Sequence, residues 1–156
     1  MEYSNEAISI TGQQLEKLPE KVCLFSGIKH LNLQKNNLST LNACLSNFNQ
    51  LEVLNLNRNQ FNDIPKEVYQ LKNLKELHLA GNPIQEIPRQ IEVLTQLEVL
   101  DLWDTSISEV PKWIIDLKNL KVLDVRNTYL KTADLDWLIK ARPDLKVESS
   151  FGCNCN

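Results

Sequence analysis

One histidine and two aspartates recur at a constant interval in the second half of the sequence. His78, Asp101 and Asp124 follow one another at intervals of 23 residues. An imidazole beside carboxylates suits a general acid/base pair or a weak cation site. Adjacent carboxylates raise the pKa of one of them and hold the proton on a neighbouring histidine to higher pH. These groups can act together only if the chain brings them side by side.

The same interval organises nearly the whole chain. Residues 74–88 place their apolar side chains in the pattern L-x-x-L-x-L-x-x-N-x-I-x-x-I-P. Copies of this pattern begin at Asn5, where the copy is degenerate, and at Ile28, Leu51, Leu74, Leu97 and Leu120. A fixed period of this length predicts stacked repeats that bury their apolar faces against one another.

This pattern resembles the leucine-rich-repeat family over residues 5–147. It is similar to the 23-residue type with an Ile-Pro pair, found in intracellular Ras-binding and scaffold members and in short bacterial ones. The resemblance implies an α/β solenoid, a single domain over residues 1–156. It implies a horseshoe of about six repeats with a parallel concave sheet, an irregular or 3-10 convex side and a C-terminal capping helix. It also implies protein–protein interaction, and the compact size and helical end favour a bacterial source.

The two ends of the array depart from the pattern. The first strand, at residues 7–11, is predicted to have no partner on its N-terminal side, which leaves a sheet edge exposed. Near the other end, Thr132 as an N-cap and an amphipathic run ended by Pro143 predict a helix. The helix belongs to a predicted cap over residues 132–147, and residues 148–156 form a tail.

The four cysteines could form two disulfides, but regular repeats do not need them. Cys23 and Cys44 fall on the convex side of neighbouring repeats, where we expect small thiols that fill the core. Cys153 and Cys155 form a C-x-C pair in the tail, which alone is a weak signal for a metal or a redox site. We expect no metal and no cofactor.

The bulk composition argues against two classes of partner. The 17 basic and 20 acidic residues give a net charge of −3, too small and too evenly mixed to predict binding to nucleic acid or to an anionic membrane. No run of apolar residues is long enough to span a membrane, and the N-terminus does not resemble an export signal. These features favour a cytoplasmic location, and the bulk charge names no partner. A protein partner is what the resemblance implies, and we expect the protein to be a monomer.

The concave surface can be written down from the repeat. In this fold, alternate strand residues face the concave side, and parallel strands in register stack equivalent residues at ~4.8 Å. His78, Asp101 and Asp124 are therefore predicted neighbours, whereas His30 lies ~10 Å from His78, too far to share one zinc ion. An open sheet offers no pocket that excludes solvent, and the sequence has no phosphate-binding loop or nucleophile elbow. We expect a solvated polar row that contacts the partner, with a weak cation site as the alternative, and no enzyme.

The centre of the predicted site is Trp103. It is expected to project into solvent beside the small Ala80 and Gly81, with Arg126 on its other flank. Trp and Arg are enriched at interface hot spots, and an exposed tryptophan is costly unless a partner covers it. The alternative is that Trp103 lies flat on its neighbours, under Arg126 in a cation–π contact. The predicted partner-binding residues are Trp103, Arg126, His78, Asp101, Asp124, Val99, Val122, Glu76, Asn57, Arg58 and Asp104.

A second functional hypothesis belongs to a different class. The chain could be a structural or accessory module that acts by self-association, either through the exposed first strand or through the C-terminal cap at Trp137. This hypothesis predicts a mass that depends on concentration and a Trp103→Ala variant that behaves normally.

Overall fold

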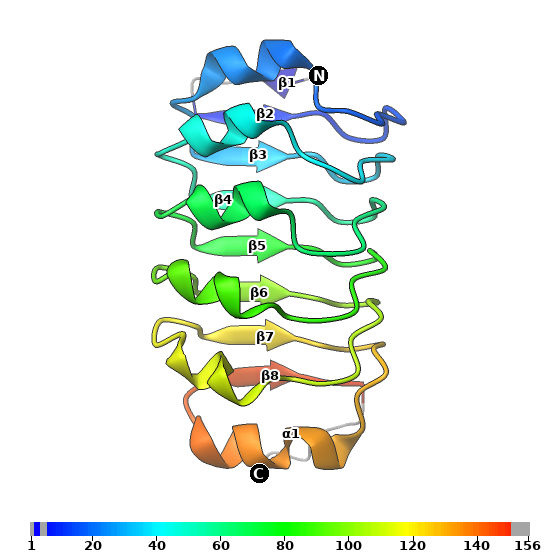
Figure 1. Cartoon of the computed structure of the whole chain (residues 1–156), viewed down its shortest axis with the longest axis vertical. Helices are drawn as coiled ribbons and strands as arrows, with labels where there is room; N and C mark the ends of the chain where they lie inside the picture. Colours follow the sequence, from blue (N-terminus) through cyan, green and yellow to red (C-terminus); the bar gives the residue numbers. More distant parts are fainter. Residues whose placement is uncertain (1, 4–5, 151–156) are drawn as a thin grey trace.

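One sheet runs the whole length of the molecule (Figure 1). The structure is a computed structural model that describes residues 2–3 and 6–150. The strands lie in sequence order: β1 (Glu2–Tyr3), β2 (Ala7–Ser9), β3 (His30–Asn32), β4 (Val53–Asn55), β5 (Glu76–His78), β6 (Val99–Asp101), β7 (Val122–Asp124) and β8 (Lys146–Glu148). Strands β2 to β8 are parallel. The predicted leucine-rich-repeat solenoid is confirmed.

Short 3-10 helices form the opposite face of each turn. They are η1 (Glu20–Phe25), η2 (Ala43–Asn47), η3 (Lys66–Gln70), η4 (Arg89–Val93) and η5 (Lys112–Asp116). Proline precedes four of them in an extended conformation, because its ring fixes φ and stops the helix from extending backwards. Asn42 takes this place in the second repeat, and its side chain accepts the N–H of Cys44 at 3.0 Å.

The core is a stack of leucine and isoleucine layers between the sheet and the 3-10 helices, with Phe48 and Phe61 fully buried among them. Buried asparagines follow the strand exits in three repeats. Asn59, for example, donates from Nδ2 to Leu33 O (3.0 Å) and Leu56 O (2.9 Å) and accepts the N–H of Leu38 (3.0 Å). These bonds satisfy backbone groups that would otherwise be buried without partners.

The N-terminal edge differs from the prediction. Strand β1 pairs antiparallel with β2, placing Tyr3 opposite Ile8 and Glu2 opposite Ser9. The first parallel strand is therefore covered rather than exposed. The prediction failed because residues 2–3 carry no repeat pattern, and an antiparallel partner needs only a short extended segment.

The C-terminal cap has the predicted helix and one more strand. Helix α1 (Thr132–Ala141) buries Leu135 and Leu138 against the last repeat. Its N-cap is Lys131 rather than Thr132, because the Asp134 carboxylate accepts the N–H of Lys131 at 2.7 Å. Strand β8 then pairs with β7 and extends to Glu148, the first residue of the predicted tail. Residues 151–156, including Cys153 and Cys155, lie outside the described residues.

The convex side holds a covalent link that the sequence analysis did not expect. Cys23 and Cys44 form a disulfide between η1 and η2, with their Cα atoms 5.7 Å apart. The expectation of two free thiols is wrong, because neighbouring turns bring the two side chains within the range that a disulfide spans. No helix in the described part of the chain is long and apolar enough to cross a bilayer.

Candidate functional site

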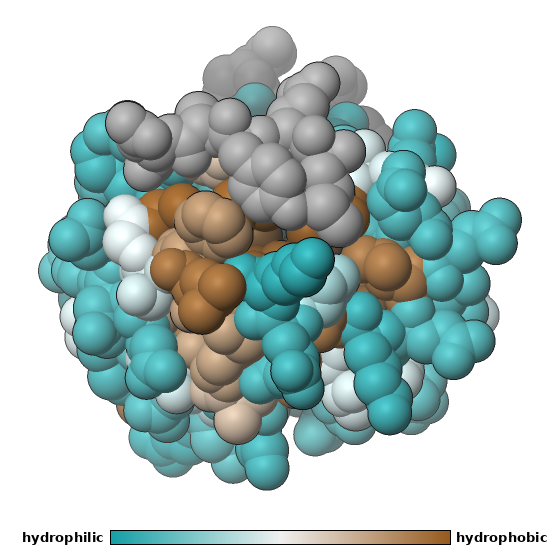
Figure 2. Space-filling view, turned by 90° about the horizontal axis from the view of Figure 1, so that it is seen from above, coloured by the Kyte–Doolittle hydropathy of each residue, from teal (hydrophilic) through white to brown (hydrophobic). Residues whose placement is uncertain are grey.

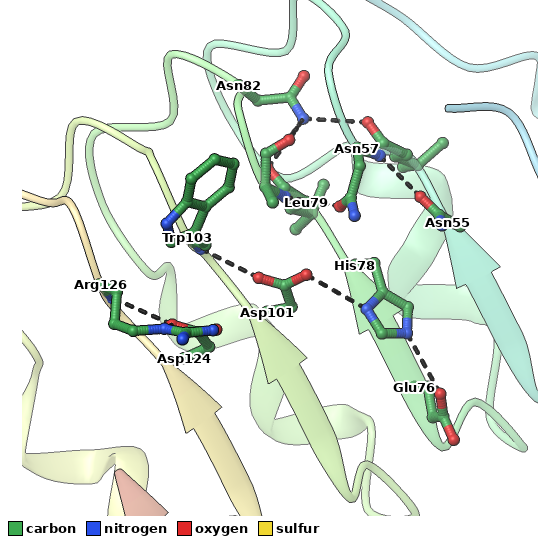
Figure 3. A network of polar contacts seen from close by, with 12 residues as sticks. Asn55, Asn57, Glu76, His78, Leu79, Asn82, Asp101, Trp103, Asp124 and Arg126 are labelled. Atoms are coloured by element: carbon green, nitrogen blue, oxygen red, sulfur yellow. Dashed lines mark hydrogen bonds and ion pairs between the residues drawn. The ribbon is translucent and has the colours of Figure 1, made fainter. Parts of the chain in front are cut away.

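The histidine and the aspartates meet on the concave face, as the repeat spacing predicts. Register pairs His78 of β5 with Asp101 of β6, and Asp101 with Asp124 of β7. His78 Nδ1 lies 3.3 Å from Asp101 Oδ2, and Nε2 lies 3.2 Å from Glu76 Oε2 (Figure 3). Both ring nitrogens therefore face carboxylates.

His78 and Asp101 shift each other's pKa values through their hydrogen bond. The hydrogen bond to Asp101 raises the pKa of His78 against the opposing effect of burial, and Glu76 raises it further. Burial pushes the pKa of Asp101 upward, but hydrogen bonds from His78 and from the backbone N–H of Trp103 outweigh it, so the net pKa lies below the ordinary value. The expectation that one of two adjacent carboxylates has a raised pKa is therefore wrong for Asp101, because its neighbours compensate its charge.

Asp101 and Asp124 have a structural role at the strand exits. Each accepts, through Oδ1, the backbone N–H of the residue two positions later, Trp103 and Arg126, both at 3.1 Å. Asn32 and Asn55 do the same in earlier repeats. The column thus satisfies the alternate backbone N–H groups at the strand exits, whereas the N–H groups between them, such as those of Leu102 and Asp104, bond to the next repeat. His78 interrupts the column, and Asn57 Oδ1 of the preceding repeat accepts the N–H of Ala80 instead, at 2.7 Å.

Arg126 is bound to Asp124 rather than to the indole of Trp103. Its Nη2 lies 2.6 Å from Asp124 Oδ2 and its Nε lies 3.0 Å from Oδ1, a two-point pairing of a guanidinium with a nearly buried carboxylate. Figure 3 shows the guanidinium against Asp124, apart from the indole ring. The cation–π alternative is therefore not the arrangement observed.

Trp103 is half-buried and does not project freely into solvent, contrary to the prediction. It lines the same hollow as Ala80, which is buried. The small side chain of Ala80 leaves space beside the indole that a larger residue would fill. Leu24, Phe25, Val93 and Tyr129, none of them on the concave strands, are the large apolar side chains with greater exposure in the described part of the chain.

A hollow of about 360 Å³ lies at the strand exits on the concave side. It is lined by Gln34, Lys35, Asn57, Arg58, Ala80, Asp101, Trp103, Asp124 and Arg126. Six predicted site residues therefore meet there, and Lys35 and Gln34 join them. Four others do not line it: Glu76, Val99 and Val122 lie earlier on the strands, and His78 lies level with Asp101 in the register. Asp104 pairs instead with Asn127 and lines a separate hollow with Tyr129.

The residues at the strand exits share a left-handed backbone. Lys35 and Arg58 have φ of 56° and 55°, and Gly81 follows at 66°. The N–H groups of the two basic residues donate to Asn57 O (2.8 Å) and Ala80 O (2.6 Å). A Cβ on Gly81 would lie 3.1 Å from Cγ of Arg58. The missing side chain at Gly81 therefore leaves room for Arg58.

Comparison with known proteins decides the family. The family described as "Leucine-rich repeat region" matches residues 41–138 of the sequence. The chain belongs to the leucine-rich-repeat family. A search of curated proteins gives no match.

Three solved leucine-rich-repeat structures are similar. An internalin (InlF) from Listeria monocytogenes has a TM-score of 0.75 and 20% identity, covering 92% of this chain and 40% of its own. A Leptospira interrogans protein has a TM-score of 0.61 and 24% identity, covering 92% and 48%. The ectodomain of the Arabidopsis thaliana receptor kinase GASSHO1/SCHENGEN3, crystallised with CASPARIAN STRIP INTEGRITY FACTOR 2, has a TM-score of 0.61 and 34% identity, covering 73% and 14%. The chain spans less than half of each, and the two bacterial structures show the fold alone.

Sequence reasoning about this leucine-rich-repeat protein missed Lys35. The residue stands one repeat before Arg58 in the same column, so the 23-residue spacing could have found it. It also missed alternating charges at the strand entrances. Ion pairs there join Glu6 with Lys29 (2.9 Å), Glu52 with Lys75 (2.7 Å) and Glu98 with Lys121 (2.7 Å). No group of three His, Cys, Asp or Glu side chains in the described residues is placed to hold a metal ion.

Proposed function

We propose that this protein recognises a partner protein on its concave sheet, with Trp103 at the centre of the contact. The observation that carries the proposal is the concave hollow, in which a half-buried indole lies among charged side chains on strands held by the repeat. A solenoid presents such a surface already formed, so binding costs little ordering entropy. His78, Glu76, Val99 and Val122 extend the surface along the strands.

Membership of the family supports this role in general terms. The similar plant ectodomain was crystallised with a bound factor, and a preformed concave surface suits the same use here. The mixed charges of the chain support a protein partner rather than nucleic acid or a membrane. We propose that the protein acts as a monomer without enzymatic activity or a cofactor, and its bacterial source remains a prediction.

The disulfide between Cys23 and Cys44 is informative about the cellular compartment in which the protein resides. Disulfides persist in oxidising compartments and are rare in the cytoplasm. The bond between Cys23 and Cys44 therefore favours an oxidising location over the cytoplasmic one that the sequence predicts. Measuring the thiol content of the protein extracted from its source under acid trapping would decide between the two locations.

The test of the concave site is capture of the partner from an extract of the source organism by immobilised protein. Trp103→Ala should lose the partner that the wild type retains. The matched control is Tyr129→Ala, which removes an aromatic side chain that is 72% exposed and off the concave strands. Loss from the control alone, or retention by both variants, would contradict the proposal. Circular dichroism melts establish that both variants are folded.

Self-association remains a second candidate because of one observation at the N-terminal end. Leu24 is 80% exposed and Phe25 is 43% exposed on η1. Figure 2 views this end and shows patches of apolar surface among hydrophilic residues. Since β1 covers β2, the contact would use η1 rather than the first strand. Sedimentation of the wild type and of Leu24→Asp over a range of concentrations tests it, and a monomeric wild type would refute it.

A further inference from the structure

Around the concave hollow, the carboxylates have bonding partners within the described residues, whereas the side chains of two of the cations do not. Both carboxylates that line it have partners: Asp101 is bound by His78 and the N–H of Trp103, and Asp124 by Arg126. Lys35 and Arg58 also line it, and neither has a side-chain ion pair or hydrogen bond within the described residues. The hollow therefore presents free positive charge on a protein whose net charge is −3.

The two cations are placed to act on one anion. Lys35 and Arg58 hold equivalent positions in consecutive repeats, where neighbouring strands lie ~4.8 Å apart. Both are exposed and both have the same left-handed backbone. Gly81 leaves room for the Arg58 side chain. A carboxylate of an incoming chain can therefore contact both cations, and salt will screen the attraction only partly at this short range.

The apolar part of the hollow lies at a fixed distance from these cations. Trp103 is two repeats beyond Arg58, about 10 Å across the sheet. An extended peptide advances about 3.3 Å per residue, so three or four residues span that distance. The indole beside the small Ala80 offers a site for one apolar side chain.

Resting on the function proposed above, we infer that the hollow binds an extended acidic peptide segment of the partner. A Glu or Asp side chain lies between Lys35 and Arg58, and an apolar side chain three or four residues away packs on Trp103. The carboxylate comes from a side chain within the segment and not from a chain terminus, because the hollow is open to solvent and does not close around a chain end.

The test is a selection of random dodecapeptides displayed on phage against the immobilised wild type. Enriched peptides should carry an acidic residue three or four positions from an aromatic or large aliphatic one. Synthetic versions, acetylated and amidated, should bind about tenfold more weakly to the Lys35→Glu, Arg58→Glu double variant, because like charges replace the pairing. The matched control is Lys66→Glu, Lys112→Glu, which makes the same change in net charge at exposed residues on the convex side.

The outcomes separate this inference from the proposed function. Basic enriched peptides, or acidic ones that bind both double variants alike, would overturn the inference. If the Trp103→Ala variant nevertheless failed to bind these peptides, the proposed concave binding site would still be supported. Peptides that bind only with a free C-terminal carboxylate would also overturn the inference. Absence of any enriched peptide, or binding that Trp103→Ala leaves unchanged, would count against both.

Discussion

The side chain of Asn57 accepts the backbone N–H of Ala80, one repeat later, at 2.7 Å. In four other repeats, an Asn or Asp two positions before the donor provides this acceptor. His78 occupies that position in the fourth repeat and binds Asp101 and Glu76 instead. Asn57 therefore compensates for a histidine that the regular column would not contain.

This compensation predicts the behaviour of two variants. Asn57→Ala leaves the N–H of the buried Ala80 without its acceptor, which should lower the free energy of unfolding by about 1–3 kcal/mol. Adding His78→Asn should recover part of the loss, because asparagine at that position can accept the same N–H. Urea denaturation of the two variants and of His78→Asn alone measures the effect. If the double variant is no more stable than Asn57→Ala, the N–H of Ala80 is not the cause.

The pH dependence of stability should report on His78. Its pKa is raised in the folded protein, chiefly by the hydrogen bond to Asp101. The folded state therefore binds the proton more tightly than the unfolded chain. The resulting stabilisation is complete below the ordinary histidine pKa of about 6.5 and is lost as pH rises through the folded pKa.

Urea denaturation at a series of pH values from about 5.5 to 8.5 tests this dependence. The wild type should lose stability as the pH rises, and His78→Gln should remove that loss. His30→Gln is the matched control, since His30 is exposed and lies two strands away. A wild type whose stability stays flat or increases through this range would contradict the assigned protonation of His78.

Much of this arrangement follows from the repeat in the sequence. The 23-residue period sets which residues pair across the sheet, so the meeting of His78, Asp101 and Asp124 was predictable. The bonds among these groups were not, because Arg126 has both an indole and a carboxylate within reach, and side-chain geometry decides between them. Strand β1 and the disulfide were missed for a related reason. Residues 2–3 follow no repeat period, and the period places Cys23 and Cys44 on neighbouring turns without indicating whether their sulfur atoms are bonded.

Gly81 offers a test of the strand-exit geometry. Its φ of 66° is strained for any residue with a Cβ, and a Cβ there would approach Cγ of Arg58 to 3.1 Å. Gly81→Ala should therefore lower the free energy of unfolding by about 1–2 kcal/mol. Gly27→Ala is the control, because a Cβ there meets no atom within 4 Å. Equal effects of the two substitutions on the urea midpoint would show that the left-handed backbone at Gly81 is not required.

The disulfide should stabilise the N-terminal repeats. Cys23 and Cys44 close a loop of 21 residues in sequence separation, and a link across a loop of this size stabilises a fold by about 3 kcal/mol, mainly by restricting the unfolded chain. The experiment uses Cys153→Ser, Cys155→Ser as the background, so that a reductant acts only on this pair. Reduction should lower the free energy of unfolding, and Cys23→Ser, Cys44→Ser in the same background should match the reduced protein without responding to reductant.

Because the bond joins η1 to η2, hydrogen exchange should speed up most in these two segments, whereas β5 to β7 should keep their protection. If that background variant contains two free thiols before any reductant is added, the bond does not form. If reduction leaves the free energy of unfolding unchanged, the bond does not stabilise the fold.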